Sequence, residues 1–296
     1  MTDSSTQGIQ VVLVTGATGT VGSEVVRQLA AAGQQPRALV RNLEAARQRL
    51  GDQADLAAGD LDQPETLYRA LDGAGRVFLL TIPGERQLAQ ERAVIEAARR
   101  AGVHQVVRLS RAGADERSPL HVARFHGQAE RQLQSSGLAA TILRPPMFMQ
   151  NLLFMVRGGA IASAIGDGKV AMVDARDVAA AAVAALTTGG HAGKTYVVTG
   201  PRAVSLADAA GLLSRQLGRV IRCERLAPSD VRDGFLAMGA DPWLADDAAT
   251  LDSLLASGHD EPVADDIRNL TGRPPRTLEA FVRDYAVAFD ASGCGE

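Results

Sequence analysis

Lysine is nearly missing from this chain. Of its 31 basic residues only Lys169 and Lys194 are lysines, so a catalytic motif that needs a lysine must use one of these two. The 296 residues also include 34 acidic ones, which leaves a formal net charge of −3. These totals indicate neither a nucleic-acid-binding protein nor a membrane-surface protein.

Cysteine and long apolar runs are scarce as well. Cys223 and Cys294 are too few and too far apart for a disulfide framework or a metal site, which indicates a reducing compartment. The longest apolar run, 178–186, is far short of the roughly 20 residues of a membrane span. The polar residues 1–8 lack the basic and apolar regions of a signal peptide. We therefore expect a soluble, cytoplasmic protein.

The most informative stretch is residues 11–22, Val-Val-Leu-Val-Thr-Gly-Ala-Thr-Gly-Thr-Val-Gly. Its first four residues predict a short buried strand. After three glycines, residues 23–32 place Val25, Val26 and Leu29 on one helical face, and Gly33 ends the helix. Such a turn predicts a dinucleotide phosphate site, because glycines admit the diphosphate and free amide groups favour its charge. The alternative is an ordinary strand-to-helix turn.

The end of a second predicted strand, 36–40, bears on the choice of cofactor. In a dinucleotide fold this position lies beside the adenosine ribose, and an acid there favours NAD. Here Arg41 stands at the strand end and no acid precedes it in the strand. Arginine suits a 2′-phosphate, so the residue favours NADP(H), unless it is simply a solvated arginine.

Strands and helices continue to alternate toward residue 143. Further strands are expected at 54–61, 76–80, 103–109 and 139–143. Helices are expected at 43–50, from 63 onward, at 88–101 and at 118–134. This order predicts a parallel, doubly wound sheet, whose ligand lies beyond the carboxyl ends of the strands. Five residues fall at those ends: Gly16, Arg41, Asp60, Thr81 and Ser110.

Two later segments hold further candidates. On helix 118–134, His126 and Glu130 lie one turn apart beside an inward apolar stripe. His126 is either a catalytic residue or a packed or half-exposed side chain, and we expect Glu130 to make surface or helix–helix contacts. The run 144–155 has two prolines and cannot continue a strand. It is either core or the wall of a pocket for a flat apolar ligand.

The remaining chain completes the predicted domains. Strands are expected at 169–173 and 194–200, and from Ser205, paired with Asp208 as a helix cap, the pattern becomes mostly helical. We predict an α/β fold with a doubly wound Rossmann domain of residues 8–153 with 168–200. A smaller, mainly helical substrate lobe comprises 154–167 with 201–289, and 1–7 and 290–296 are flexible tails.

These motifs resemble the NmrA-like family of atypical short-chain dehydrogenase/reductases. The resemblance rests on the glycine turn, Arg41, Ser110, His126-x-x-x-Glu130 and the run Arg144-Pro-Pro-Met-Phe-Met-Gln-Asn. It extends from Val11 to about Ala286 and is strongest to triphenylmethane reductase and the related NADPH:quinone oxidoreductases. It implies a Rossmann domain, a small C-terminal domain, a deep cleft between them and NADPH as the cofactor.

The resemblance also implies individual contacts. It assigns the diphosphate to Gly16, Ala17, Thr18, Gly19, Thr20, Val21 and Gly22. Arg41 would hold the 2′-phosphate, and the adenine would lie at Asp60 and Leu61. The nicotinamide side is assigned to Leu80, Thr81, Ile82, Pro83 and Pro145. Substrate contacts are expected from His126, Met147, Phe148 and Phe154.

The Tyr-x-x-x-Lys pair of most short-chain reductases is absent. That pair lowers a phenol pKa so that the phenol protonates a developing alkoxide. The tyrosines are Tyr68, Tyr196 and Tyr285, and the residues four positions later are Asp72, Gly200 and Phe289. An enzyme without this pair must reduce substrates that need little help from an acid.

Three functions remain open. The first is an NADPH-dependent reductase of small, flat electrophiles (quinone-like, conjugated, iminium or other cationic acceptors), with Ser110 and His126 as catalytic candidates. The second is a regulator of the NmrA type that binds nucleotide without chemistry, and the third is a non-redox lyase or isomerase. No histidine spacing indicates a metal. We expect a monomer or homodimer whose partner is a small-molecule substrate, without nucleic acid or membrane.

Overall fold

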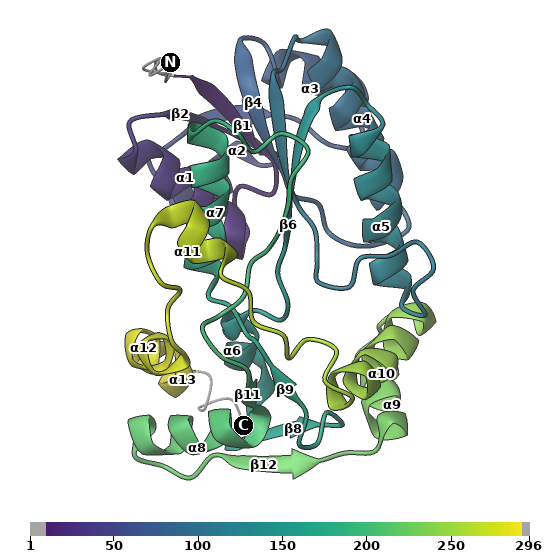
Figure 1. Ribbon diagram of the computed structural model, residues 1–296, viewed down its shortest axis with the longest axis vertical. Coiled ribbons are helices and arrows are strands. Elements are labelled where there is room, and N and C mark those ends of the chain that lie inside the picture. The colour runs from purple at the N-terminus through teal and green to yellow at the C-terminus, as the bar shows by residue number, and fades with distance from the viewer. Residues whose placement is uncertain (1–9, 292–296) are drawn as a thin grey trace. The chain divides into compact units, whose positions relative to one another are not determined.

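The computed structural model describes residues 10–291, which divide into two compact units (Figure 1). The first unit comprises the chain up to Ser110, Phe125–Arg144 and Val178–Tyr196. The second comprises Arg111–Arg124, Pro145–Asp177 and the chain from Val197 onward. The expected tails lie outside the described residues, except that Asp290 and Ala291 belong to helix α13 (Ala286–Ala291).

A seven-stranded sheet forms the centre of the first unit, in the order β10-β6-β5-β4-β1-β2-β3. Its strands are β1 (Val11–Val14), β2 (Gln35–Val40), β3 (Asp55–Ala58), β4 (Ala74–Leu79), β5 (Gln105–Leu109), β6 (Ala139–Arg144) and β10 (Thr195–Val197). The neighbours from β3 to β6 pair in parallel, and the strand order reverses at β1. This is the doubly wound topology, so the predicted fold class is confirmed.

Helices cover both faces of this sheet (Figure 1). On one side lie α1 (Thr20–Ala31) and α2 (Leu43–Leu50), and on the other α3 (Pro64–Ala70), α4 (Gln87–Arg100) and α5 (His121–Gln134). A further helix, α7 (Ala175–Thr187), precedes β10. The predicted inward face of α1 is confirmed, because Val25, Val26 and Leu29 are fully buried.

The second unit combines short strands with helices. Its strands are β7 (Val156–Arg157), β8 (Ala160–Ser163), β9 (Lys169–Val170), β11 (Val204–Ser205) and β12 (Arg222–Arg225). The helices before residue 240 are the 3₁₀ helix η1 (Met149–Asn151), α6 (Leu152–Met155), α8 (Leu206–Leu217) and α9 (Pro228–Ala237). After them come α10 (Pro242–Ala256), α11 (Asp266–Thr271), α12 (Leu278–Asp284) and α13.

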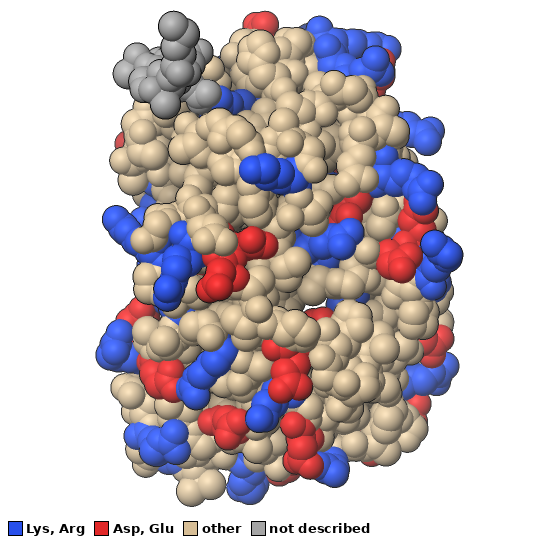
Figure 2. Space-filling model, in the orientation of Figure 1, with Lys and Arg blue, Asp and Glu red and all other residues tan. Residues whose placement is uncertain are grey.

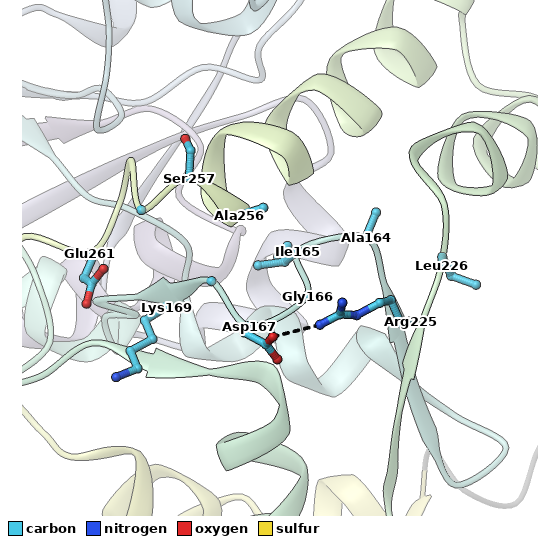
Figure 3. A pocket seen from close by; sticks show the side chains of 12 residues that line it. Ala164, Ile165, Gly166, Asp167, Lys169, Arg225, Leu226, Ala256, Ser257 and Glu261 are labelled. Carbon is cyan, nitrogen blue, oxygen red and sulfur yellow. Dashed lines mark hydrogen bonds and ion pairs between the residues drawn. The ribbon is translucent and has the colours of Figure 1, made fainter.

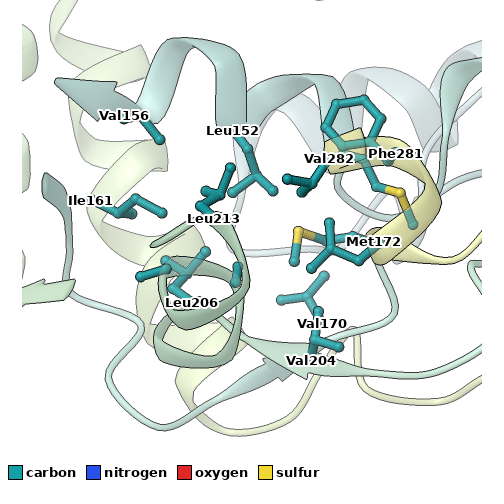
Figure 4. Packing of buried hydrophobic residues seen from close by; sticks show 14 of the residues in the cluster. Leu152, Val156, Ile161, Val170, Met172, Val204, Leu206, Leu213, Phe281 and Val282 are labelled. Atoms are coloured by element: carbon teal, nitrogen blue, oxygen red, sulfur yellow. The ribbon is translucent and has the colours of Figure 1, made fainter. Parts of the chain in front are cut away.

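One apolar cluster holds the second unit together (Figure 4). Met149, Leu152 and Met172 pack in it with Leu213 and Phe281, all buried. The second unit also includes the segments 111–124, 145–153, 168–177 and 197–200, which were expected in the Rossmann domain. The physical reason is that the apolar side chains of 149–152 and 170–172 complete this core.

The surface carries mixed charge. Figure 2 shows Lys and Arg side chains interspersed with Asp and Glu over the face drawn. Within residues 10–291, no helix combines the length and the apolar character that a membrane crossing requires.

Candidate active site

The glycine turn joins β1 to α1 and leaves space at its backbone. Gly16 has a φ of 62°, which L side chains rarely adopt, and a Cβ on Gly22 would lie 2.1 Å from the Gly16 carbonyl oxygen. Helix α1 therefore packs directly on the turn. Apart from its own chain neighbours, a Cβ on Gly19 would meet the Gly16 oxygen, at a tight 3.2 Å. No side chain caps α1, whose N-cap is Gly19, so this helix end fits a bound diphosphate.

The ends of β2 and β3 offer different groups. Arg41 is exposed, and within the described residues its guanidinium forms no hydrogen bond or ion pair. The Asp60 carboxylate accepts from the Asp62 backbone N–H at 3.0 Å, and the Asp60 backbone N–H donates to the Thr66 hydroxyl at 3.0 Å. Leu61 is half-buried. Arg41 therefore has donors to spare for a phosphate.

The loop after β4 is fastened to the glycine turn. The Thr15 hydroxyl donates to the Leu80 carbonyl at 2.7 Å and accepts from the Leu80 N–H at 2.8 Å. Beyond this point Pro83 is exposed and the Ile82 side chain is 83% exposed. Thr81 is buried instead, and its hydroxyl donates to Glu91 at 2.7 Å.

His126 belongs to a buried network of charged groups. The Arg108 guanidinium donates to both carboxylate oxygens of Glu91, Nε to Oε2 at 2.6 Å and Nη2 to Oε1 at 2.9 Å. The same Nη2 lies 3.1 Å from His126 Nδ1. Because a guanidinium only donates, Nδ1 must accept, and the proton of the neutral ring is on Nε2.

Ser110 belongs to a second network of the same kind. Its hydroxyl donates to Glu130 Oε1, and Arg144 donates to both oxygens of Glu130, at 2.9 Å and 2.5 Å. Glu130 is buried, so the expectation of a surface contact is wrong. Its carboxylate is buried because Arg144 and Ser110 compensate its charge. The Ser110 hydroxyl proton is therefore used in this hydrogen bond, and the Ser110 oxygen can still accept one.

Four predicted contact residues lie in the second unit. Pro145 is buried and its carbonyl accepts from the Ala112 N–H at 2.7 Å. Met147 and Phe148 are half-buried, next to a backbone pairing with Val173. Phe154 is 70% exposed. The proline-rich run thus divides, with Met149 and Leu152 in the core and Phe154 outside it.

Sequence reasoning missed Glu91 and Arg108. A signal existed, since Arg108 interrupts the otherwise apolar end of the strand expected at 103–109. Its partner on α4 could not be identified, because a helix glutamate usually faces solvent.

A cavity of about 500 Å³ lies in the second unit, and its lining includes none of the predicted site residues (Figure 3). Its lining includes Lys169, Glu261 and the ion pair of Arg225 with Asp167 at 3.0 Å. Among the described residues, no group of three or more His, Cys, Asp or Glu is placed to hold a metal ion.

The doubly wound sheet and its glycine turn define a protein of the Rossmann class. The model of the NmrA-like family matches residues 9–282, so this chain belongs to that family, as its motifs predicted. It is 40% identical to an NAD(P)H azoreductase of Xenophilus azovorans over 285 residues, 95% of this chain and 100% of the relative.

Two solved structures are similar over nearly their whole length. The NADPH-dependent quinone oxidoreductase of Escherichia coli, complexed with NADPH, has a TM-score of 0.83 at 30% identity. The match covers 93% of this chain and 99% of that one. Triphenylmethane reductase of Citrobacter sp., complexed with NADP(H), has a TM-score of 0.79 at 25% identity, with coverages of 95% and 99%.

Proposed function

We propose that this protein is an NADPH-dependent reductase that transfers hydride directly to small, flat electrophilic acceptors. The observation that carries the proposal is the uncapped glycine turn at α1, together with an unpaired Arg41 at the neighbouring strand end, within the part of the chain that the structure describes. Its similarity to an azoreductase, a quinone oxidoreductase and a triphenylmethane reductase supports a conjugated acceptor.

In this proposal each strand end contributes one part of the cofactor site. The turn Gly16–Gly22 holds the diphosphate and Arg41 the 2′-phosphate, while Asp60 and Leu61 lie at the adenine. The residues 80–83 would form the nicotinamide side, where the exposed Ile82 side chain would contact the cofactor. When bound, NADPH supplies the hydride.

The two polar candidates are suited to orienting an acceptor. The Ser110 hydroxyl donates to a carboxylate, and His126 carries its proton on Nε2 as a neutral ring. Neither is a strong acid. Hydride transfer to a simple ketone builds a localised alkoxide, whereas a quinone gives a delocalised anion and a cationic acceptor loses its charge. The proton that completes quinone reduction then comes from water.

The test is a steady-state comparison of a quinone or triarylmethyl cation with an unactivated aliphatic ketone. We expect turnover of the first two, and ketone turnover lower by about 10²–10⁴, the usual contribution of a general acid. Ser110→Ala and His126→Ala should each slow quinone reduction only modestly, because neither supplies a whole proton-transfer step.

Two results would contradict the proposal. Efficient ketone reduction that His126→Ala abolishes would mean that the histidine replaces the missing tyrosine. No NADPH oxidation with any quinone, dye or iminium compound would favour a regulator that only binds the nucleotide.

A further inference from the structure

Arg108 and Glu91 form an ion pair in the interior of the first unit. Arg108 on β5 is 0% exposed and Glu91 on α4 is 1% exposed. Removing two charges from water is costly, and apolar residues of similar size often stabilise such a site equally well. Stability alone therefore does not explain the pair.

The hydrogen bonding around the pair is incomplete, which is a second reason why stability alone does not explain the pair. Thr81 and Gln87 add donors to Glu91 Oε1, at 2.7 Å and 3.0 Å. Within the described residues, however, Arg108 Nη1 and Gln87 Oε1 are buried without a hydrogen-bond partner. A site selected only for stability would have satisfied or avoided these atoms.

The contact that distinguishes this pair is the one to His126. Glu91 holds two of the guanidinium nitrogens, and this fixes Nη2 at 3.1 Å from His126 Nδ1. We propose that Arg108, held by Glu91, is a positioning residue that keeps His126 as the neutral Nε2–H tautomer. This role rests on the proposed function, in which that N–H orients the acceptor.

The Glu130–Arg144 pair supplies a matched control. It is another arginine that donates to both oxygens of a buried glutamate, and this glutamate accepts from Ser110. Changing it should alter the surroundings of Ser110 and leave the tautomer of His126 as it was.

The first measurement is ¹⁵N NMR of the histidine side chains in the full chain, which has five histidines. His126→Asn identifies the His126 signals by their loss. In the wild type we expect an unprotonated Nδ1 and a protonated Nε2. In Glu91→Gln/Arg108→Met, where the introduced amide oxygen still accepts from Thr81 or Gln87, both nitrogens should shift toward an average of the two tautomers. Glu130→Gln/Arg144→Met should leave the signals unchanged.

The second measurement is kcat with a quinone acceptor. Glu91→Gln/Arg108→Met should lower kcat by about the same factor as His126→Ala. In the His126→Ala background the same double change should lower kcat by less than about a further twofold. If the two effects were independent, the two losses of kcat would multiply instead. The KM for NADPH should stay unchanged.

The outcomes separate the two proposals. A protonated Nδ1 in the wild type overturns the positioning role, and so does a full multiplicative loss of kcat in the His126→Ala background. If the double variant does not fold, the wild-type spectrum and that of Arg108→Lys, which lacks the planar fork that reaches Glu91 and His126 together, still decide. Absence of any turnover would contradict the proposed reductase but would leave the tautomer measurement valid.

Discussion

Ser110 at a strand end and His126 on a helix were both catalytic candidates, and their hydrogen-bond partners make them different. Each lies beside an arginine–glutamate pair, but Ser110 donates to a glutamate while His126 accepts from an arginine. The serine oxygen can then accept a hydrogen bond, whereas the histidine carries its donor proton on Nε2. The role of a polar side chain is thus decided by the group beside it.

Arg41 should decide the preference between the two nicotinamide cofactors. Arg41→Ala removes one charged hydrogen-bonding group, worth about 1.5–3 kcal/mol, so most of an about ten- to hundredfold preference for NADPH should disappear. Calorimetric dissociation constants for NADPH and NADH would measure it. Arg49→Ala, an exposed arginine on α2, is the control. Equal affinities in the wild type would contradict the assignment.

Asp252 should make stability depend on pH. Burial raises its pKa, although the Ala164 N–H at 2.9 Å and the Ser163 hydroxyl at 3.1 Å, which both donate to it, oppose the shift. Its folded pKa therefore lies above the unfolded value of about 3.9, and stability falls as pH rises from there through the folded pKa.

Asp252→Asn keeps an acceptor oxygen and removes this titration. The variant should lose less stability than the wild type between about pH 4 and neutral pH, as measured by urea unfolding at both values. The exposed Asp233→Asn serves as the control. An unchanged pH dependence in Asp252→Asn would refute the assignment.

At the scale of elements, a helix start could be predicted where the capping residues are adjacent to the helix in the sequence. The expected pairing of Ser205 with Asp208 is confirmed as a capping box, and α8 ends before Gly218, which has a φ of 65°. The helix expected from residue 118 begins at His121 instead. Its first N–H groups, those of His121 and Val122, donate to Asp247, a cap distant in the sequence.

Within the β1–α1 turn, Gly19 and Gly22 should respond differently to a side chain. Gly19→Val adds atoms where only the Gly16 oxygen lies near, at an ordinary φ of −80°, so the fold should survive while NADPH binding is blocked. Gly22→Ala should destabilise the fold itself, because its Cβ would lie 2.1 Å from a backbone oxygen. Circular dichroism and NADPH titration of both variants distinguish these effects. Normal NADPH affinity in Gly19→Val would place the diphosphate elsewhere.

At the scale of the whole molecule, the two units alternate along the chain. The backbone passes from one to the other after residues 110, 124, 144, 177 and 196. Neither unit is therefore a continuous segment, and the core of the second combines Leu152 and Met172 with Leu213 and Phe281.

Phe281 should be among the most important side chains of that core. It is fully buried and stacks on Tyr285 with ring centroids 4.5 Å apart. Phe281→Ala should cost about 3–5 kcal/mol of unfolding free energy. The exposed Phe154→Ala should stay within about 0.5 kcal/mol. Denaturant unfolding compares the two, and a loss near that of Phe154→Ala would mean that the core closes over the gap.

The sequence by itself determined the doubly wound sheet, the glycine turn and the family, because these depend on short-range patterns. Periodicity shows which faces are buried, and glycine spacing shows where the backbone must turn. Only the tertiary structure decided that residues 145–153 and 168–177 belong to the second unit, and that Glu91 and Glu130 are buried. Burying a carboxylate depends on a partner that compensates its charge, and Arg108 and Arg144 lie 17 and 14 residues away in the chain. No local pattern encodes a contact of that kind.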